Sequence, residues 1–436
     1  MTPMPLIFVA ISDIAGKVRG KAFPADQLDK RLQRGVGWTP TNVQITCFDR
    51  IAQSPFGALG DLLLIPDAQA SADVTLGDGP REVFMLADIT TLEGEPWDLC
   101  MRSLLKAALK RLHDAAGVHL VGAFEHEFQL KGVPALDNQA YGYEGFQLQR
   151  RLCEVLMTAL KTAGLEPDSI MKEYGPNQYE VVVGPAIGIR SADQAVILRE
   201  VTRAVARSFG EAATFTPIRD PANVGNGVHI HMSFLDDDGA PVTYDPAGRC
   251  GMSQTTDAFA AGILKYLPNI IALTAPSVIS YSRLTPHRWS AAYNNLGFRD
   301  REASLRVCPV TAKDPASIAR QFNIEYRAAD AAASPYLALA AIVHAGVQGI
   351  EDGLKAPAPT QEDLSLLSPE DLQARGVVRL PETLEAALDA FEANPVVKSW
   401  FPEQFVRIYR AHKTAEIAYV ADMDTPERFA AYQATY

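Results

Sequence analysis

Short runs rich in apolar residues, separated by turn residues, fill the first part of the chain. Leu6–Ile11 and Val18–Ala22 lie on either side of a glycine turn, which predicts a hairpin of two strands. The same pattern predicts three more short strands, at Val43–Phe48, Asp61–Ile65 and Val83–Asp88. Gly, Pro and Asp separate these runs, so residues 1–96 are predicted to form a small β-rich domain.

The pattern changes to longer, helical periods after Pro96. Asp98–Ala116 places leucine and alanine at helical spacing on one face. Helices are also predicted at residues 146–163, 192–209, 384–392 and 403–420, and strands at 118–130, 178–183 and 225–234. These elements follow no repeated strand–helix–strand rhythm, so residues 97–436 are predicted to be an α+β domain with a largely antiparallel sheet. Lys355–Leu380, rich in Pro, Ser, Asp and Glu, is predicted to be an exposed connector.

Residues 225–233, which read GNGVHIHMS, combine a glycine turn with a strand whose polar residues share one face. Because side chains alternate along a strand, His229, His231 and Ser233 point one way while the apolar residues between them point the other. Two histidines at alternate positions of a strand are often structural groups. Other residues of the chain therefore decide whether this face belongs to a binding site.

Composition limits the kinds of partner. The chain has 436 residues and a net charge of -12, which argues against nucleic acid or an anionic membrane as a partner. Its five cysteines are scattered without a CxxC spacing, a pattern that favours a reducing cytoplasm. The first residues lack the basic region of a signal peptide, and no apolar window reaches the ~18 residues of a membrane span. We expect a cytoplasmic protein of two domains.

Carboxylates recur in otherwise apolar strands. Glu125 and Glu127 alternate in one predicted strand, and Glu180 lies in another. A buried, unpaired carboxylate costs several kcal/mol, so such groups need cations or arginines opposite them. A salt bridge would explain any one of these residues but does not easily explain the whole set. The candidate metal ligands are Glu125, Glu127, Glu173, Glu180, His229 and Glu325. Mostly carboxylate ligands with one imidazole favour Mg²⁺ or Mn²⁺ over Zn²⁺.

Arginines are concentrated towards the end of the same region. The group consists of Arg283, Arg299, Arg301, Arg306 and Arg327. Guanidinium groups at this density suit the binding of a carboxylate or of a transferring phosphoryl group. A solvated charged face is the alternative interpretation. The apolar residue Leu305 beside Arg306 argues for a strand instead, because the segment is not uniformly polar.

Six blocks of sequence, in this order, resemble the signature blocks of the glutamine synthetase family. They read GAFEHEF, EYGPNQYE, ATFTP with GNGVHIHMS, SYSRLTP, RDREASLR and IEYRAADAAASPYLALAA, and they span Gly122–Ala341. The resemblance implies a small N-terminal β-grasp-like domain and a large catalytic domain in which an antiparallel sheet forms a funnel. It also implies ATP as co-substrate, glutamate as the acid substrate and a homo-oligomeric ring, a hexamer or stacked hexamers, with active sites between subunits.

The resemblance further implies a role for single positions. Glu127, Glu173 and Glu180 would hold one cation, and Glu125, His229 and Glu325 would hold a second one that bridges the ATP phosphates. The amino-acid substrate would be bound by Arg283, Arg327 and Gly225. Arg301 and Arg306 would neutralise the transferring phosphoryl group, and nucleotide contacts would come from Ser233, His231 and Arg306.

The sequence departs from the family pattern at several positions. Ammonia-using members have a glutamate six residues after the arginine that Arg283 matches, whereas this chain has Trp289. A tryptophan can neither pair with ammonium as a full charge nor accept its proton, but its ring can stack on a larger amine. The ammonium-site motif of the first domain is also missing, and Asp49 is its nearest match. Three other differences affect expected contacts to the nucleotide or the amino-acid backbone, at Ile218, Val224 and Asn323.

Residues and resemblance together predict an ATP-dependent carboxylate–amine ligase. The enzyme would activate the γ-carboxylate of glutamate as an acyl phosphate and transfer it to a primary amine bulkier than ammonia, such as an aromatic amine or a polyamine. Arg301, Arg306 and Trp289 are the predicted catalytic residues. Two alternatives stay open at this point: glutamine synthesis from ammonia, and a non-catalytic structural member of the family.

Overall fold

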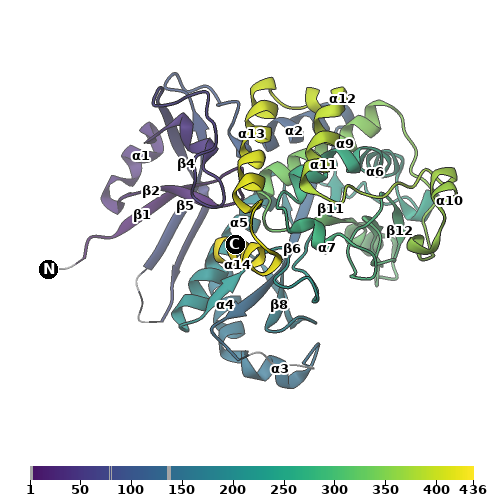
Figure 1. Cartoon of the computed structure of the whole chain (residues 1–436), viewed down its shortest axis with the longest axis horizontal. Helices are drawn as coiled ribbons and strands as arrows, with labels where there is room; N and C mark the ends of the chain where they lie inside the picture. Colours follow the sequence, from purple (N-terminus) through teal and green to yellow (C-terminus); the bar gives the residue numbers. More distant parts are fainter. Residues whose placement is uncertain (1–2, 78, 80, 135–138) are drawn as a thin grey trace.

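A computed structural model describes residues 3–77, 79, 81–134 and 139–436 (Figure 1). In the described N-terminal part, five strands form a mixed sheet in the order β2-β1-β5-β4-β3. Their bounds are β1 (Leu6–Ser12), β2 (Val18–Pro24), β3 (Val36–Trp38), β4 (Leu62–Thr75) and β5 (Arg81–Thr90). β1 and β5 run parallel, and the other neighbours are antiparallel. The predicted hairpin and the strands predicted near residues 61–65 and 83–88 are confirmed.

The strand predicted at Val43–Phe48 is wrong. A 3-10 helix occupies Pro40–Gln44, and a tight loop closed by one bridge between Ile45 and Ile51 follows it. Pro40 at the first helical position fixes a φ angle that suits a helical turn. Val43 and Cys47 of the segment are buried in the packed interior instead of along a paired strand. This loop also carries Asp49, with a φ of 56°.

In the described part of residues 98–436, nine strands form the large sheet that carries the site. Its main order is β12-β13-β14-β11-β6-β8-β7, and β9 and β10 each pair with β6. The bounds are β6 (His119–Lys131), β7 (Pro167–Lys172), β8 (Gln178–Val183), β9 (Ala186–Ile187), β10 (Ala212–Thr214), β11 (Val228–Leu235), β12 (Leu296–Phe298), β13 (Leu305–Val307) and β14 (Ile324–Ala329). Only the β12–β13 pair among these is parallel, so the predicted largely antiparallel sheet is confirmed.

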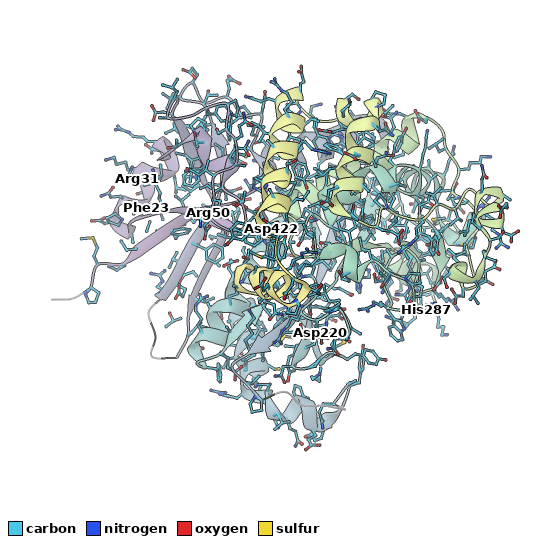
Figure 2. All side chains as sticks on the ribbon, viewed as in Figure 1. Phe23, Arg31, Arg50, Asp220, His287 and Asp422 are labelled. Atoms are coloured by element: carbon cyan, nitrogen blue, oxygen red, sulfur yellow. The ribbon has the colours of Figure 1, made fainter. Side chains whose placement is uncertain are left out.

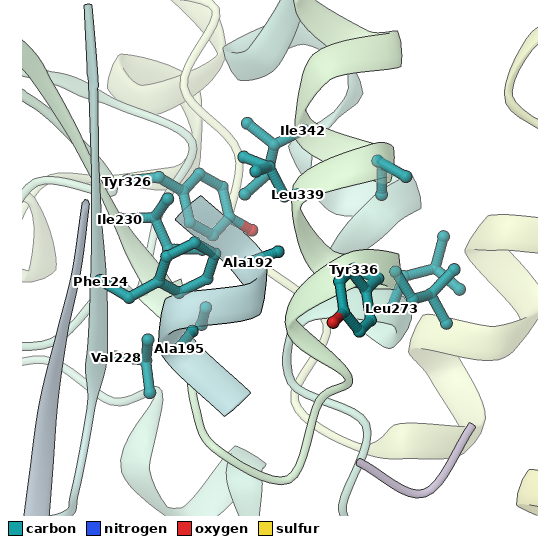
Figure 3. Close-up of a cluster of buried hydrophobic side chains, with 14 of the residues drawn as sticks. Phe124, Ala192, Ala195, Val228, Ile230, Leu273, Tyr326, Tyr336, Leu339 and Ile342 are labelled. Atoms are coloured by element: carbon teal, nitrogen blue, oxygen red, sulfur yellow. The ribbon is translucent and has the colours of Figure 1, made fainter. Parts of the chain in front are cut away.

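One face of this sheet is covered by helices. They include α2 (Met101–Ala116), α5 (Ile189–Ser208), α6 (Gln254–Thr274) and α9 (Pro335–Glu351). Phe124 and Ile230 of neighbouring strands lie against Ala192 of α5 and Leu339 of α9, all fully or almost fully buried (Figure 3). Along β11 buried and half-buried residues alternate, which leaves its histidines on the opposite face. The helix layer therefore fixes which side chains the sheet turns towards the site.

The remaining helices are mostly short. They are α1 (Leu28–Arg34), α3 (Tyr143–Leu148), α4 (Arg150–Thr162), α7 (Ser280–Arg283), α8 (Pro315–Gln321), α10 (Pro369–Ala374), α11 (Leu384–Ala393), α12 (Pro395–Ser399), α13 (Glu403–Val420) and α14 (Thr425–Thr435). The helix predicted at residues 146–163 is two helices, because Gln149 leaves helical geometry with a φ of -115°. The segment predicted as an exposed connector, Lys355–Leu380, is only partly exposed: it contains α10, and Leu364 and Leu380 are buried.

Charged and aromatic contacts join the N-terminal sheet to the rest of the chain. Arg102 of α2 bonds Asp67 of β4 and Asp88 of β5, both in the small sheet, and Asp193 of α5. Helices α13 and α14, yellow in Figure 1, lie between the two parts, and Tyr432 of α14 packs with Cys47 of the 45–51 loop. Within the small part, the guanidinium of Arg31 lies over the ring of Phe23; Figure 2 labels both residues.

Candidate active site

The strand register brings the acidic residues together. Glu125 of β6 lies opposite His229 of β11, and Glu127 of β6 lies opposite Glu180 of β8. On the other side of β11, His231 lies opposite Glu325 of β14. All six candidate metal ligands line one cavity of about 540 Å³. They come from β6, β8, β11, β14 and the β7–β8 loop, so residues 200 positions apart in sequence meet on one face of the sheet.

Two overlapping ligand groups exist within this cavity. Ligand atoms of Glu125, His229 and Glu325 all lie within 4.8 Å of one another, and so do those of Glu127, Glu180 and His229. The Nδ1 atom of His229 is 3.6 Å from carboxylate oxygens of both Glu125 and Glu325. Glu173 lines the cavity but has other partners. Its carboxylate accepts hydrogen bonds from the Tyr141 hydroxyl at 2.7 Å and from the Tyr174 amide at 3.1 Å.

The electrostatics of the cavity call for cations. Burial raises the pKa of Glu180 to about 9, and the negative charges of Glu125 and Glu127 add to the effect. Burial also raises the pKa of Glu127 to about 7, although the Gly227 amide, which donates to its carboxylate at 2.7 Å, opposes the rise. A divalent cation between these oxygens would remove the cost of keeping them charged together. The donor set, mostly carboxylate, fits Mg²⁺ or Mn²⁺.

Three buried arginines face the acidic residues. Arg306 donates to Glu325 at 2.9 Å, and Arg327 donates to the other oxygen of the same carboxylate. Burial would raise the pKa of Glu325, but the positive charges of His229 and Arg327 lower it to about 2. Arg283 donates to the backbone carbonyls of β14 at 3.0 and 2.9 Å. The interpretation of these arginines as a solvated charged face is wrong, because each is at most 6% exposed.

Arg299 and Arg301, the other two arginines of the group found in the sequence, differ from these three in their position. Arg301 lines the cavity, and its backbone carbonyl accepts a hydrogen bond from Arg327. Arg299 does not line this cavity but a neighbouring one of about 660 Å³, where its guanidinium lies over the Phe298 ring. Among the described residues, the two cavities share His287 and Trp289 in their walls. The arginine cluster of the sequence is therefore divided between two neighbouring cavities.

The loop that carries Trp289 is held in an uncommon backbone conformation. His287 and Trp289 have φ angles of 63° and 52°, in the left-handed region that non-glycine residues rarely adopt. The carboxylate of Glu302 accepts hydrogen bonds from both of their amides, at 3.1 and 2.6 Å. Arg327 donates to the Trp289 carbonyl at 3.1 Å. Glu302 and Arg327 thus fix the loop from two sides; Figure 2 labels His287.

Exposed aromatic rings form a row at the mouth of the cavity. The ring of Trp289 lies edge to face with Tyr174, and Tyr174 with Tyr141, each pair at 5.4 Å between centroids. The three residues are 52%, 52% and 58% exposed, although large aromatic side chains usually bury most of their surface. This exposure argues against a core role for Trp289. It leaves an aromatic surface next to the carboxylate of Glu173, which Tyr141 contacts directly.

The remaining predicted residues divide into those inside and those outside the cavity. His231 lines it and bonds Asn323 through Nδ1 at 2.8 Å, whereas Ser233, two positions further along β11, is not among the lining residues described. Gly225 also lines it, and a Cβ there would stand 2.5 Å from the Arg283 side chain, so only glycine fits. Ile218, one of the positions that depart from the family pattern, is fully buried in an apolar cluster.

Several lining residues were not predicted as site residues from the sequence. Tyr141 and Tyr174 lie in irregular segments, where no periodic pattern marks a face. Gln178 donates to the Gly225 carbonyl at 2.8 Å and to Asn226 at 2.9 Å, and so holds the glycine turn. Its alternation with Glu180 in β8 was the available signal.

Fold and site define an enzyme that handles anionic substrates: a cavity with clustered carboxylates suited to divalent cations lies beside buried arginines. Comparison with models of protein families identifies the family of the chain. Residues 98–432 match the glutamine synthetase catalytic domain, and residues 1–97 match the glutamine synthetase N-terminal domain. The chain belongs to the glutamine synthetase family.

Individual relatives agree with this assignment. A γ-glutamylpolyamine synthetase of Streptomyces coelicolor is 32% identical over 99% of this chain and 93% of its own length. A glutamine synthetase of Methanocaldococcus jannaschii is 29% identical over 93% of this chain and 89% of its own. A solved structure described as a novel glutamine synthase homolog superposes with a TM-score of 0.92 at 38% identity, covering 100% of this chain and 99% of that one.

Family membership makes the chain an ATP-dependent ligase. Members of the family use ATP and divalent metals such as Mg²⁺ or Mn²⁺, take glutamate with an amine or ammonia, and are oligomeric. The fold predicted from the sequence, a small N-terminal domain followed by a large catalytic domain, is confirmed. Among the described residues, none of the helices has the length and apolar character needed to cross a membrane.

Proposed function

We propose that this enzyme joins the γ-carboxylate of glutamate to a primary amine bulkier than ammonia, with cleavage of ATP to ADP and phosphate. Trp289 carries the proposal. Its half-exposed ring stands in the cavity wall, in an aromatic row with Tyr174 and Tyr141, at the position where ammonia-using relatives are expected to have a glutamate. Such a surface favours an amine with an apolar or extended body over ammonium.

The cavity residues suggest how the first step proceeds. A γ-carboxylate oxygen of glutamate attacks the γ-phosphorus of ATP, and ADP leaves. Arg301 and Arg306 would offset charge on the moving phosphoryl group, while His231 and Ser233 would contact the nucleotide. Divalent cations held by the carboxylates and His229 supply further charge neutralisation at the phosphates. Arg283, Arg327 and Gly225 would hold the amino-acid end of glutamate.

In the second step the amine nitrogen attacks the acyl carbon, the bond from this carbon to the phosphate oxygen breaks, and the leaving phosphate takes up the extra proton of the nitrogen. Burial of the amine body against Trp289 would place the nitrogen for attack. At roughly 25 cal/mol per Å², covering ~100 Å² of apolar surface contributes ~2.5 kcal/mol before ordering costs. This is on the order of a fifty-fold preference over ammonium.

We also propose that the site is completed in a homo-oligomeric ring. Family members are oligomeric, and the side chain of Asp49 is 66% exposed on the N-terminal part, where Arg19 holds it at 2.8 Å. An exposed carboxylate on a loop fixed by an arginine is suited to reach a neighbouring subunit. In such a ring the cavity of one subunit would lie beside the Asp49 loop of the next.

An amine screen tests the proposed function. Purified protein is incubated with glutamate, ATP, Mg²⁺ and one amine at a time: ammonium, ethanolamine, putrescine, phenethylamine or tyramine. Phosphate release is measured, and the product mass is determined. We expect glutamate-dependent release with at least one larger amine and a product that has the mass of the γ-glutamylamide. Release with ammonium alone would indicate glutamine synthesis, and no release with any acceptor would favour a non-catalytic member.

A further inference from the structure

A second group of metal-ligating side chains lies on the surface. It consists of His113 in the last turn of α2, His119 at the start of β6 and Asp237 in the turn after β11. The Nε2 atoms of both histidines lie 2.9 Å from the same Oδ1 atom of Asp237. The two imidazole rings are 4.8 Å apart. Two nitrogens and one oxygen therefore converge on one point from three separate segments.

Backbone hydrogen bonds hold these segments in place. His119 pairs with Leu235 in the β6–β11 register, and the Gly117 amide bonds the His113 carbonyl at 2.7 Å to end α2. The turn that carries Asp237 is closed by Asp236, whose carboxylate accepts the amides at positions 238 and 240 at 3.0 and 2.8 Å. Because the carboxylate of Asp236 accepts the amides of the turn, the carboxylate of Asp237 is available to face the histidines.

We propose that His113, His119 and Asp237 bind a divalent transition-metal ion of the Zn²⁺, Ni²⁺ or Co²⁺ class. Imidazole suits these ions, and two imidazoles with one carboxylate form a ligand set that zinc sites use. The side chains are 42%, 45% and 70% exposed, so the remaining coordination positions face solvent and would hold water. The ligand set is nitrogen-rich, whereas the cavity described above is dominated by carboxylates and favours Mg²⁺ or Mn²⁺.

The surface site is separate from the active site but shares its strands. His119 precedes Glu125 by six residues along β6, which corresponds to about 20 Å at the rise of an extended strand. An ion bound to His119 and Asp237 would connect the ends of β6 and β11, the strand pair that carries Glu125 and His229. An ion that binds the folded chain but not the unfolded chain stabilises the folded state by mass action, so it should raise the melting temperature.

The test is a Zn²⁺ titration in saturating Mg²⁺, which keeps the carboxylate cavity filled. Bound Zn²⁺ is measured by calorimetry, and the visible absorption of Co²⁺ reports on the ligand geometry. We expect the wild type to bind one Zn²⁺ per chain that the double variant His113→Ala/His119→Ala does not bind. Asp237→Asn should weaken this binding by about tenfold or more, because even supporting partners of a metal site contribute that much.

Asp114→Asn is the matched control. Asp114 neighbours His113 on the same helix and is exposed, but its carboxylate pairs with Lys110 and is not part of the cluster. This variant should bind Zn²⁺ as the wild type does and show the same rise in melting temperature. Equal Zn²⁺ binding by the wild type and the double variant would overturn the proposal. An equal loss in Asp114→Asn would also overturn it, because the effect would then reflect surface charge.

Discussion

Glu180 shows the energetic cost of burying a single carboxylate in this site. Its carboxylate is buried beside Glu125 and Glu127, and burial with these charges raises its pKa to about 9. The hydrogen bonds of the sheet do not require such a cluster of buried carboxylates. Replacing one of these carboxylates should relieve the repulsion between them. The cluster is therefore costly to the chain alone and useful only when cations bind.

This cost gives a prediction for Glu180→Gln. The variant should lose turnover at saturating Mg²⁺, yet the metal-free variant should melt at a higher temperature than the metal-free wild type, because it no longer has to take up the proton that the raised pKa of Glu180 requires at neutral pH. Mg²⁺ should raise the melting temperature of the wild type more than that of the variant. Asp168→Asn is the matched control: Asp168 lines the same cavity but is exposed, and its replacement should keep turnover. Calorimetry with and without Mg²⁺ and a phosphate-release assay check both parts.

At the residue scale, the sequence predicts the acidic cluster but not its aromatic border. Glu125, Glu127 and His229 stand at alternate positions of long apolar strands, so their common face follows from strand geometry. Tyr141 and Tyr174 have no such signal, because they lie outside regular strands and helices. Only contacts between segments far apart in the sequence bring these two tyrosines into a row with Trp289.

The 287–289 loop is the element on which the proposed amine recognition depends. Two of its residues adopt left-handed backbone angles, and Glu302 accepts both of their amides. Strained backbone of this kind costs on the order of 1–3 kcal/mol per residue and persists only when the surroundings hold it. Without Glu302, the loop should relax and carry Trp289 away from the cavity wall.

Glu302→Ala tests this role. We expect KM for a bulky amine to rise by about tenfold or more while KM for glutamate and ATP changes little, because the cations and arginines are not touched. The tryptophan fluorescence should shift as Trp289 changes its exposure, and the shift should be missing from a Trp289→Phe/Glu302→Ala protein. Glu302→Gln should restore part of the amine KM, since its carbonyl oxygen can accept one amide. Equal changes of KM for all three substrates would argue for a general loss of structure.

Element prediction succeeds where an apolar-rich run is bounded by turn residues and fails where local chemistry or short length decides. β8 is predicted with its observed ends, because Gln178–Val183 is bounded by turn residues and almost wholly buried. β7 is missed, since most of its residues are half-buried and show no alternation. β12 has three residues, too few for a periodic signal, whereas β13 confirms the strand expected around Leu305 and Arg306. The Val43–Phe48 prediction fails because Pro40 starts a helical turn.

At the scale of the whole molecule, Arg102 joins the N-terminal sheet to the large domain. Its guanidinium is 3% exposed and contacts Asp67, Asp88 and Asp193. Arg102→Met leaves these carboxylates without their cation and should lower the free energy of unfolding by ~3–5 kcal/mol. Lys106→Met is the control, because Lys106 also pairs with Asp88 but is 45% exposed and should contribute less than ~1 kcal/mol. Denaturant unfolding of both variants measures the difference.

The same network predicts a pH dependence. Burial alone would raise the pKa of Asp67, but the hydrogen bond from Arg102 lowers it below its ordinary value of 3.8. A lowered pKa in the folded state stabilises the protein fully above the unfolded value, and this contribution is lost as the pH falls through the folded value. The stability difference between wild type and Arg102→Met should therefore shrink below about pH 4. A difference that stays constant from pH 7 to pH 3 would contradict the ion-pair explanation.

Assembly gives the third prediction at this scale. We expect light scattering to show a ring-sized oligomer and Asp49→Ala to keep that size while it impairs turnover, because the residue is exposed and would act in a neighbouring subunit. Mixing Asp49→Ala chains with Glu180→Gln chains should restore activity, since some interfaces then combine two intact halves. A fully active monomer, or mixtures with no recovery, would contradict sites shared between subunits.

Amine selectivity tests the central claim most directly. The measurement is the ratio of kcat/KM for the best larger amine to kcat/KM for ammonium, in wild type and in Trp289→Glu, with Trp289→Phe as the control that keeps an aromatic ring. We predict a wild-type ratio well above one, a similar preference in Trp289→Phe, and a fall of about tenfold or more in Trp289→Glu, equivalent to ~1.4 kcal/mol. A wild type that prefers ammonium, or a ratio that Trp289→Glu leaves unchanged, would contradict the account.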